Sequence, residues 1–161
     1  MEAFMQEIAV EEARLFTCQP MPLEWAKFAS KHKFKWSQVH FHVDNAGKIP
    51  TAPGFYCFFI GVAPSSLPPI GYPLYVGKTE RTLRLRFRDY VREKASGRGR
   101  VHIRRFLHAF DDELTFFYTP FKGTPKSVQK IERELHDALR PPFGQIGFSA
   151  AVGKRVKAFR R

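Results

Sequence analysis

The amino-acid sequence predicts an α+β fold, with a small, mainly antiparallel three-stranded sheet flanked by helices. Three short segments rich in aromatic and β-branched residues are bounded by turn residues, as buried strands are: Phe55–Ile60, Leu74–Val76 and Leu114–Tyr118. Between and after them, apolar residues recur at helical spacing. The chain has 161 residues, 43% of them apolar and 17 of them phenylalanine, which is enough to fill one core.

An N-terminal extension, residues 1–50, precedes this core and is expected to pack on it as an accessory segment. Its expected elements are two helices over Glu2–Phe16 and Leu23–Lys33, a short strand over Gln38–Val43, and a turn at Asn45–Gly47. We therefore divide the chain into this extension, a central domain of residues 51–145 and a basic tail of residues 146–161.

The central domain has clear start and stop signals for its helices. In chain order we expect a Pro- and Ser-rich loop at Val62–Tyr72, a helix from Arg81 to Lys94, a short amphipathic helix at Ile103–Phe110, and a helix that begins with Thr124 as N-cap and Pro125 at its first position and stops at Pro141-Pro142. The order strand, strand, helix, helix, strand, helix is that of an α+β domain.

The net charge of +12 indicates a polyanionic partner. Between Lys78 and Arg105 there are eleven basic residues against three acidic ones. Such density favours nucleic acid, although a solvated basic face would give the same composition. The sequence contains no run of about 18 apolar residues, and its first 15 residues carry four Glu against one Arg, unlike a signal peptide, so we expect a cytoplasmic protein without a membrane partner.

Two tripeptides carry the most specific signal in the sequence. Gly54-Phe55-Tyr56 and Tyr75-Val76-Gly77 resemble the pair of motifs, on two neighbouring strands, that names the GIY-YIG nucleases. Further residues that match this family follow in order: Lys78, Arg86, Tyr90, and Glu132 nine residues before Pro141. The resemblance covers residues 50 to 145 and leaves the N-terminal extension out.

The resemblance implies a metal-dependent endonuclease that hydrolyses phosphodiester bonds in DNA. By resemblance, Tyr56 is the general base, Tyr75 contacts the phosphate or ligand waters, and Arg86 stabilises the charge of the transition state. Glu132 would bind one Mg²⁺ or Mn²⁺ ion, and Lys78 and Tyr90 complete the expected catalytic set. A tyrosine base needs a cation nearby, because its ordinary pKa is near 10.

Helical geometry supports two of these positions without the family. At about 100° per residue, Arg86 lies about 40° from Tyr90 and at the edge of the apolar stripe of its helix. Glu132 likewise flanks the apolar stripe of the last helix, where a carboxylate can be partly desolvated. Glu134 flanks the opposite side of that stripe and is the competing candidate for a metal ligand.

Two departures from the family pattern leave an alternative open. Gly144 stands where the family usually has asparagine, and the spacing between Tyr56 and Tyr75 is longer than usual. The alternative is a catalytically degenerate module of the same fold that binds nucleic acid without cutting it. His40, His42 and Asp44 form an H-x-H-x-D pattern, for which we favour a surface or core-edge role over a metal site.

Basic side chains around the catalytic set are expected to line the path of the nucleic acid. They are Arg81, Arg84, Arg88, Arg98, Arg100, His102, Arg104, Arg105, Lys154 and Arg155. DNA is the expected partner, with RNA as an open alternative. A homodimer is a further option, since a double-strand cut from one active site needs two subunits or two sequential nicks.

Overall fold

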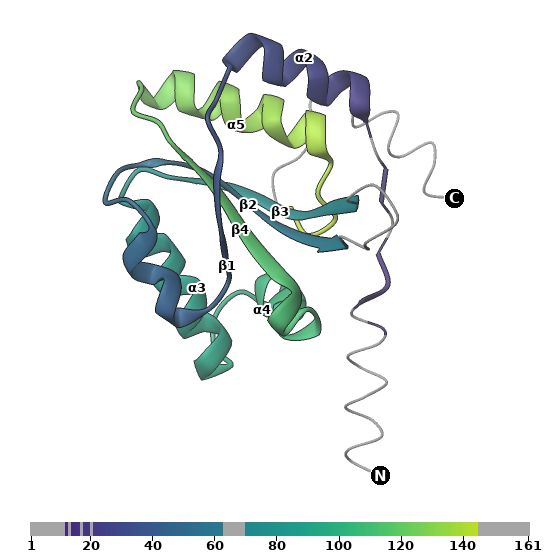
Figure 1. Ribbon diagram of the computed structural model, residues 1–161, viewed down its shortest axis with the longest axis vertical. Helices are drawn as coiled ribbons and strands as arrows, with labels where there is room; N and C mark the ends of the chain where they lie inside the picture. Colours follow the sequence, from purple (N-terminus) through teal and green to yellow (C-terminus); the bar gives the residue numbers. More distant parts are fainter. Residues whose placement is uncertain (1–11, 13, 17, 20, 63–69, 145–161) are drawn as a thin grey trace.

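The computed structural model describes residues 12, 14–16, 18–19, 21–62 and 70–144 (Figure 1). Its elements are α2 (Pro22–His32), β1 (Ser37–His40), the 3₁₀ helix η1 (Val43–Lys48), β2 (Gly54–Val62), β3 (Ile70–Thr79), α3 (Leu83–Ser96), α4 (Val101–Ala109), the 3₁₀ helix η2 (Asp111–Glu113), β4 (Leu114–Pro120) and α5 (Pro125–Leu139). The predicted α+β class is confirmed. No helix in these ranges is both long enough and apolar enough to cross a bilayer.

The sheet has four strands, so the predicted three-stranded sheet is corrected. The strand order is β1-β4-β2-β3, and every neighbouring pair is antiparallel. The added strand is β1, from the N-terminal extension, whose Ser37 pairs with Tyr118 and His40 with Thr115. It hydrogen-bonds the edge of β4 that would otherwise be left open, so the extension is part of the sheet.

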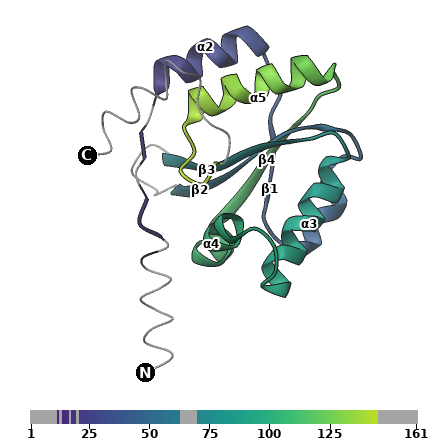
Figure 2. The same ribbon diagram turned by 180° about the vertical axis from the view of Figure 1, so that it is seen from behind.

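Helices cover both faces of the sheet. In Figures 1 and 2, α2 and α5 lie side by side on one face, and α3 and α4 lie on the other. Side chains of β2 alternate between the two layers: Phe55 and Cys57 join the core under α2 and α5, whereas Tyr56 and Phe58 join the core under α3 and α4. This alternation places Tyr56 on the same side of the sheet as the arginine-rich helix α3.

The helix signals of the sequence are confirmed in α2, α3, α4 and α5. The Thr124 side chain caps α5 by accepting from the Ser127 backbone N–H at 3.2 Å, and Pro125 occupies the first turn. The same kind of cap begins α3, where Thr82 accepts from Leu85 at 3.1 Å. Arg140, in the left-handed conformation with φ of 46°, ends α5 before Pro141.

Some expectations about loops and chain ends are corrected, and others concern residues outside the described ranges. The predicted loop at Val62–Tyr72 is too long, because β2 extends to Val62 and β3 begins at Ile70; residues 63–69 are outside the description. The predicted strand Gln38–Val43 ends at His40, and the predicted turn Asn45–Gly47 lies within η1. Most of the predicted helix Glu2–Phe16 and the whole tail 146–161 lie outside the described residues.

Candidate active site

The Tyr56 ring lies across Gly77 on the neighbouring strand. The register of β2 and β3 places these two residues opposite each other. A Cβ atom added to Gly77 would stand 2.6 Å from the Tyr56 Cζ atom, far inside van der Waals contact. The glycine of Tyr75-Val76-Gly77 is therefore needed so that the Tyr56 ring can lie over β3.

Gly54 has a similar steric role at the start of β2. A side chain there would collide with the Thr119 carbonyl oxygen on β4 and approach Leu83 Cδ1 to 3.1 Å. The missing side chain lets the start of α3 pack closely on β2 and β4, which fixes how α3 lies against Tyr56.

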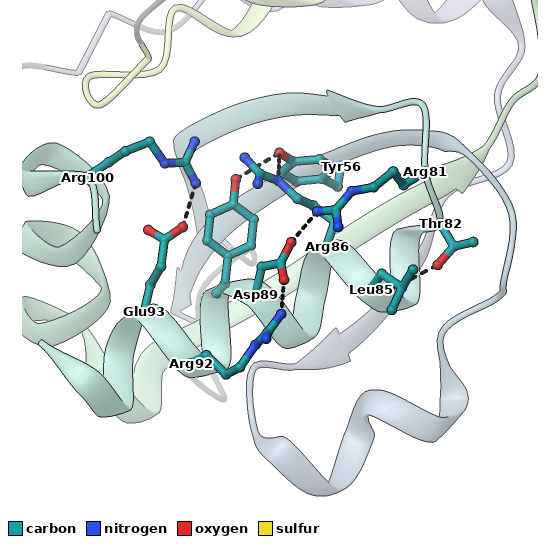
Figure 3. Close-up of polar contacts among 10 residues, drawn as sticks. Tyr56, Arg81, Thr82, Leu85, Arg86, Asp89, Arg92, Glu93 and Arg100 are labelled. Carbon is teal, nitrogen blue, oxygen red and sulfur yellow. Dashed lines mark hydrogen bonds and ion pairs between the residues drawn. The ribbon is translucent and has the colours of Figure 1, made fainter. Parts of the chain in front are cut away.

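Tyr56, Tyr90 and Arg86 form one hydrogen-bonded cluster on the α3 side of the sheet. The two tyrosine hydroxyls are 2.8 Å apart, and Arg86 Nε donates to the Tyr56 hydroxyl at 3.0 Å. The Arg86 guanidinium carbon also lies 4.8 Å from the centroid of the Tyr90 ring, within cation–π range. Figure 3 shows Arg86 reaching from α3 to the Tyr56 hydroxyl. These three side chains, all expected in the catalytic set, are therefore in direct contact with one another.

Burial keeps the two hydroxyls of this cluster protonated. Tyr56 is only 1% exposed, and desolvation raises its pKa, more than the hydrogen bonds from Arg86 and Tyr90 lower it. Desolvation also raises the pKa of Tyr90 well above its ordinary value. In this structure Tyr56 is a neutral phenol that orients Arg86.

Arg86 keeps its positive charge and has no carboxylate partner among the described residues. A guanidinium stays charged in proteins, and the neutral Tyr56 hydroxyl and Tyr90 ring contact it without neutralising it. Its neighbours differ, because Arg81 and Arg92 both pair with Asp89. Arg86 therefore presents a half-buried cation that no acidic side chain neutralises, a suitable partner for an anion.

Tyr75 packs beside the cluster. Its ring is stacked on Phe106 at a centroid distance of 5.8 Å and lies 6.3 Å from the Tyr56 ring and 6.2 Å from the Tyr90 ring. The ring of His102 lies 6.5 Å away on the α4 side. Aromatic rings therefore surround Tyr75, and two of them belong to the predicted catalytic residues Tyr56 and Tyr90.

Glu132 is buried on α5, against the end of β3. Its side chain is 6% exposed, and burial raises its pKa. The Lys78 ammonium and the Lys78 backbone N–H lower that pKa in part, whereas Glu80 raises it further. The Lys78 side chain itself pairs with Glu80 at 2.8 Å. No Lys, Arg or His side chain within the described ranges forms an ion pair with Glu132, so a bound cation would relieve the cost of burying it.

Glu134, the competing candidate, is committed to the packing of two helices. Its carboxylate pairs with Lys31 and with His32, both at 2.7 Å, and so ties α5 to α2. It lies on the α2 side of α5, away from Lys78 and the end of β3. The structure therefore favours Glu132 over Glu134 as a carboxylate for the candidate site.

Lys78 connects the two halves of the site. Its backbone faces Glu132, and its side chain lines a shallow, open pocket of about 270 Å³ together with Arg86. Thr79, Glu80 and Arg81 complete the lining. The six predicted catalytic residues therefore form two groups, Tyr56, Tyr75, Arg86 and Tyr90 on one side and Glu132 on the other, joined by Lys78 at the edge strand β3.

The candidate metal ligand of this site is a single carboxylate, that of Glu132. No group of three or more His, Cys, Asp or Glu side chains suited to a metal occurs in the part of the chain that is described. A single carboxylate suits Mg²⁺ or Mn²⁺, which keep several waters and take further oxygen ligands from a phosphate. The Mg²⁺ or Mn²⁺ ion expected from the sequence therefore stays a prediction.

The residues predicted to line the nucleic-acid path have different partners. Arg84 donates to the carbonyls of Ile49 at 2.7 Å and Gly47 at 3.1 Å, and so ties α3 to η1. Four more have protein partners or neighbours: Arg81 pairs with Asp89, Arg100 pairs with Glu93, Arg104 donates to the Gly97 carbonyl, and Arg105 donates to the Glu12 carbonyl at 3.4 Å. The His102 ring lies beside Tyr75, and Arg88 and Arg98 are exposed. Lys154 and Arg155 lie outside the described residues.

Gly144 lies against a buried histidine. A Cβ atom at Gly144 would stand 2.9 Å from Cε1 of His136 and 3.1 Å from its Nδ1. His136 is 1% exposed, and burial lowers its pKa to about 4, so its ring is neutral. The space that an asparagine at position 144 would need is taken by this ring, a relation that the sequence does not reveal.

Two other features lie apart from the candidate site. An apolar cavity of about 780 Å³ lies under α2, on the opposite face of the sheet from Tyr56, with Trp25, Trp36 and Cys57 in its lining. In the H-x-H-x-D pattern, the His40 ring contacts the Asp112 carbonyl at 2.7 Å and His42 caps η1.

No family model, curated protein or solved structure matches this chain. A functional assignment therefore depends on the geometry and chemistry of the residues around Arg86 and Glu132.

Proposed function

We propose that this protein is an endonuclease of the GIY-YIG type, which hydrolyses phosphodiester bonds in DNA with a divalent metal ion. The observation that carries the proposal is the Arg86 guanidinium, held by Tyr56 and Tyr90 and left without a carboxylate partner in the described chain. The resemblance of the motif residues to the family and the basic composition support it.

Arg86 would bind the scissile phosphate. Hydrolysis adds negative charge to the phosphate oxygens in the transition state, and a fixed guanidinium stabilises that charge without having to reorganise. Tyr56 holds Nε of Arg86, which leaves the terminal nitrogens of the guanidinium to donate toward the pocket shared with Lys78. Arg86 and Lys78 together would make this pocket attractive to a phosphodiester.

Glu132 would hold the metal ion, beside the Lys78 backbone. A bound Mg²⁺ or Mn²⁺ supplies positive charge to the phosphate and to the leaving oxygen. Burial of the Glu132 carboxylate keeps water from competing for it, and the pKa of Glu132, raised by that burial, would fall once a cation is near.

The role of Tyr56 as general base stays a prediction, and its burial counts against a phenolate in the resting protein. If Tyr56 accepts the proton of the attacking water, Tyr56→Phe abolishes turnover while the fold survives. A Tyr56→Phe variant that retains turnover would exclude Tyr56 as the general base and leave it as the residue that positions Arg86.

A cleavage assay with a substrate panel tests the proposal. Purified protein is incubated with supercoiled plasmid, single-stranded DNA and RNA, in Mg²⁺, in Mn²⁺ and in chelator, alongside Glu132→Gln. We expect cleavage of DNA that requires the metal ion and is lost in Glu132→Gln. Cleavage of RNA alone would change the substrate, and cleavage that persists in chelator would remove the metal from the proposal.

The second candidate is a nucleic-acid-binding module without turnover. The neutral, buried Tyr56 and the packing of His136 against Gly144 favour it. Salt-sensitive DNA binding by the wild type, without cleavage in any divalent ion, would establish this alternative.

The proposal extends to location and assembly. We propose that the protein acts in the cytoplasm, and that a double-strand cut would need a homodimer or two successive nicks. Sedimentation of the protein with and without a short duplex separates these two routes to a double-strand cut.

A further inference from the structure

We infer that Arg100 is a second phosphate-binding residue of this site and takes the phosphate next to the scissile one. A site with two phosphate-binding arginines would favour a polynucleotide, which has consecutive phosphates, over an isolated phosphodiester. The inference rests on the proposed function, which it deepens by assigning a separate phosphate position to one arginine.

Arg86 on α3 and Arg100, the residue just before α4, approach the same aromatic ring. The Arg100 guanidinium carbon lies 5.4 Å from the centroid of the Tyr90 ring, and that of Arg86 lies 4.8 Å from it. Both guanidinium groups are thus within cation–π range of the Tyr90 ring. Figure 3 shows Arg100 extending from the start of α4 toward Arg86 and Tyr56. The Tyr90 ring is therefore in contact with two guanidinium groups, that of Arg86, which has no carboxylate partner in the described chain, and that of Arg100, which is paired with Glu93.

The turn between α3 and α4 is built to hold Arg100 there. Glu93 on α3 accepts from the Arg100 guanidinium at 3.0 Å. Gly99, with φ of 112°, lies so close to Glu93 that a Cβ atom would stand 2.9 Å from Glu93 Cγ. Only glycine adopts that conformation readily and leaves room for the glutamate. Glu93 and Gly99 are therefore positioning residues for Arg100.

Arg100 retains donors for a ligand after its ion pair is made. A guanidinium carries five N–H donors, and Glu93 accepts from one of its nitrogens. About a third of the Arg100 side chain is exposed, so it is neither sealed in the core nor free in solvent. A purely structural link between α3 and α4 would need the Glu93 contact alone, whereas Arg100 also lies over the ring that Arg86 contacts.

The two arginines would divide two phosphates between them. Arg86 is hydrogen-bonded to Tyr56 and shares a pocket with Lys78, beside Glu132, so the reacting phosphate belongs to it. Arg100 precedes α4 and is not among the residues that line the pocket of Lys78 and Arg86, so it suits the next phosphate along the strand. A diester without a neighbouring phosphate would lack this second contact.

The test compares preference for a polynucleotide over a small diester. The kcat/KM for single-stranded DNA, divided by that for bis(p-nitrophenyl) phosphate, is measured in Mn²⁺ for the wild type, Arg100→Gln and Arg92→Gln. Arg92 is an exposed arginine of α3 that pairs with Asp89 and serves as the matched control. We expect the ratio to fall roughly 10- to 100-fold in Arg100→Gln, as for loss of a charged hydrogen bond, and to stay within about twofold in Arg92→Gln.

An unchanged ratio in Arg100→Gln would overturn the inference, as would an equal fall in the control. Thermal unfolding checks that Arg100→Gln is folded. If it is not, Arg100→Lys replaces it, and the ratio of the two kcat/KM values should fall several-fold because a lysine lacks the planar guanidinium fork.

A binding measurement separates failure of this inference from failure of the proposed function. Affinities are measured for a dinucleoside monophosphate and a trinucleoside diphosphate, without any cleavage. The wild type and Arg92→Gln should gain affinity from the second phosphate, and Arg100→Gln should lose most of that gain. A wild type that gains affinity in this way but cuts nothing would refute the nuclease and leave the Arg100 site standing; an equal gain in Arg100→Gln would refute the site.

Discussion

At the scale of single residues, Gly77 decides whether Tyr56 can reach Arg86. A methyl group at this position would overlap the Tyr56 ring and push its hydroxyl away from the Arg86 Nε. We expect Gly77→Ala to lower the free energy of unfolding by about 1–3 kcal/mol, as overpacking does. Gly47→Ala is the matched control, because nothing lies within 4 Å of a Cβ there. Denaturant unfolding of both variants measures the difference, and equal stability would contradict the packing described.

The buried histidine predicts how stability depends on pH. Burial lowers the pKa of His136 to about 4, below its ordinary 6.5, so the unfolded chain binds this proton first as the pH falls. Its contribution to stability is therefore complete above about pH 6.5 and is lost toward pH 4, by about 3 kcal/mol in all. Glu132 acts in the opposite sense, because burial raises its pKa.

A His136→Gln variant isolates this effect. Its free energy of unfolding should fall less between pH 7 and pH 4.5 than that of the wild type, whatever its stability at neutral pH. Parallel pH profiles of the two proteins would show that His136 is not the titrating group.

Part of the candidate site could be predicted at this scale, and part could not. Helical periodicity places Arg86 and Tyr90 on one side of their helix, and burial of Glu132 follows from its place beside an apolar stripe. The hydrogen bond between Arg86 and Tyr56 depends on how α3 crosses β2, which no local pattern contains. The same holds for the contact of Gly144 with His136, which joins a loop to a helix interior.

At the scale of elements, the turn between α3 and α4 is the most constrained connection near the site. Gly97 ends α3 with φ of 61°, and Gly99 has φ of 112° with Glu93 against it. Gly97→Ala meets no neighbouring atom and should lower the free energy of unfolding by about 1–2 kcal/mol, because its backbone is left-handed. Gly99→Ala should lower it more, by about 2–3 kcal/mol, because its backbone conformation is less accessible and the new methyl group would also clash with Glu93. Thermal unfolding compares them, and a smaller cost at Gly99 would contradict the positioning role of this turn.

A local pattern predicts the strand that becomes β1, but not its place in the sheet. β2 and β4 are marked by runs of aromatic residues, whereas β1 has only the four residues Ser37–His40, of which one is apolar. Its pairing with β4 joins segments far apart in the sequence, so it depends on the edge that β4 presents and not on the strand's own propensity.

At the scale of the whole molecule, the charge of +12 predicts salt-dependent binding to nucleic acid. Arg88 and Arg98 are exposed, and neither forms an ion pair with a carboxylate in the described ranges. Replacing both with Gln should reduce the slope of log K against log salt by up to about 2, since each lost phosphate contact removes about 0.9. The control, Lys130→Gln with Arg133→Gln, changes two exposed cations of α5 and should leave the slope unchanged. Fluorescence anisotropy on a labelled duplex gives both slopes, and equal slopes would place the binding face elsewhere.

The central claim is that Arg86 stabilises the charge of a phosphodiester as it is cut. The most direct test is the rate at which wild-type protein, Arg86→Gln and Arg92→Gln convert supercoiled plasmid to the nicked form in Mg²⁺. The account predicts nicking by the wild type and by Arg92→Gln, and a rate at least roughly 100-fold lower in Arg86→Gln, the size of effect seen when a group that stabilises transition-state charge is removed. Equal rates in the two arginine variants, or no nicking by a wild type that binds the plasmid, would contradict it.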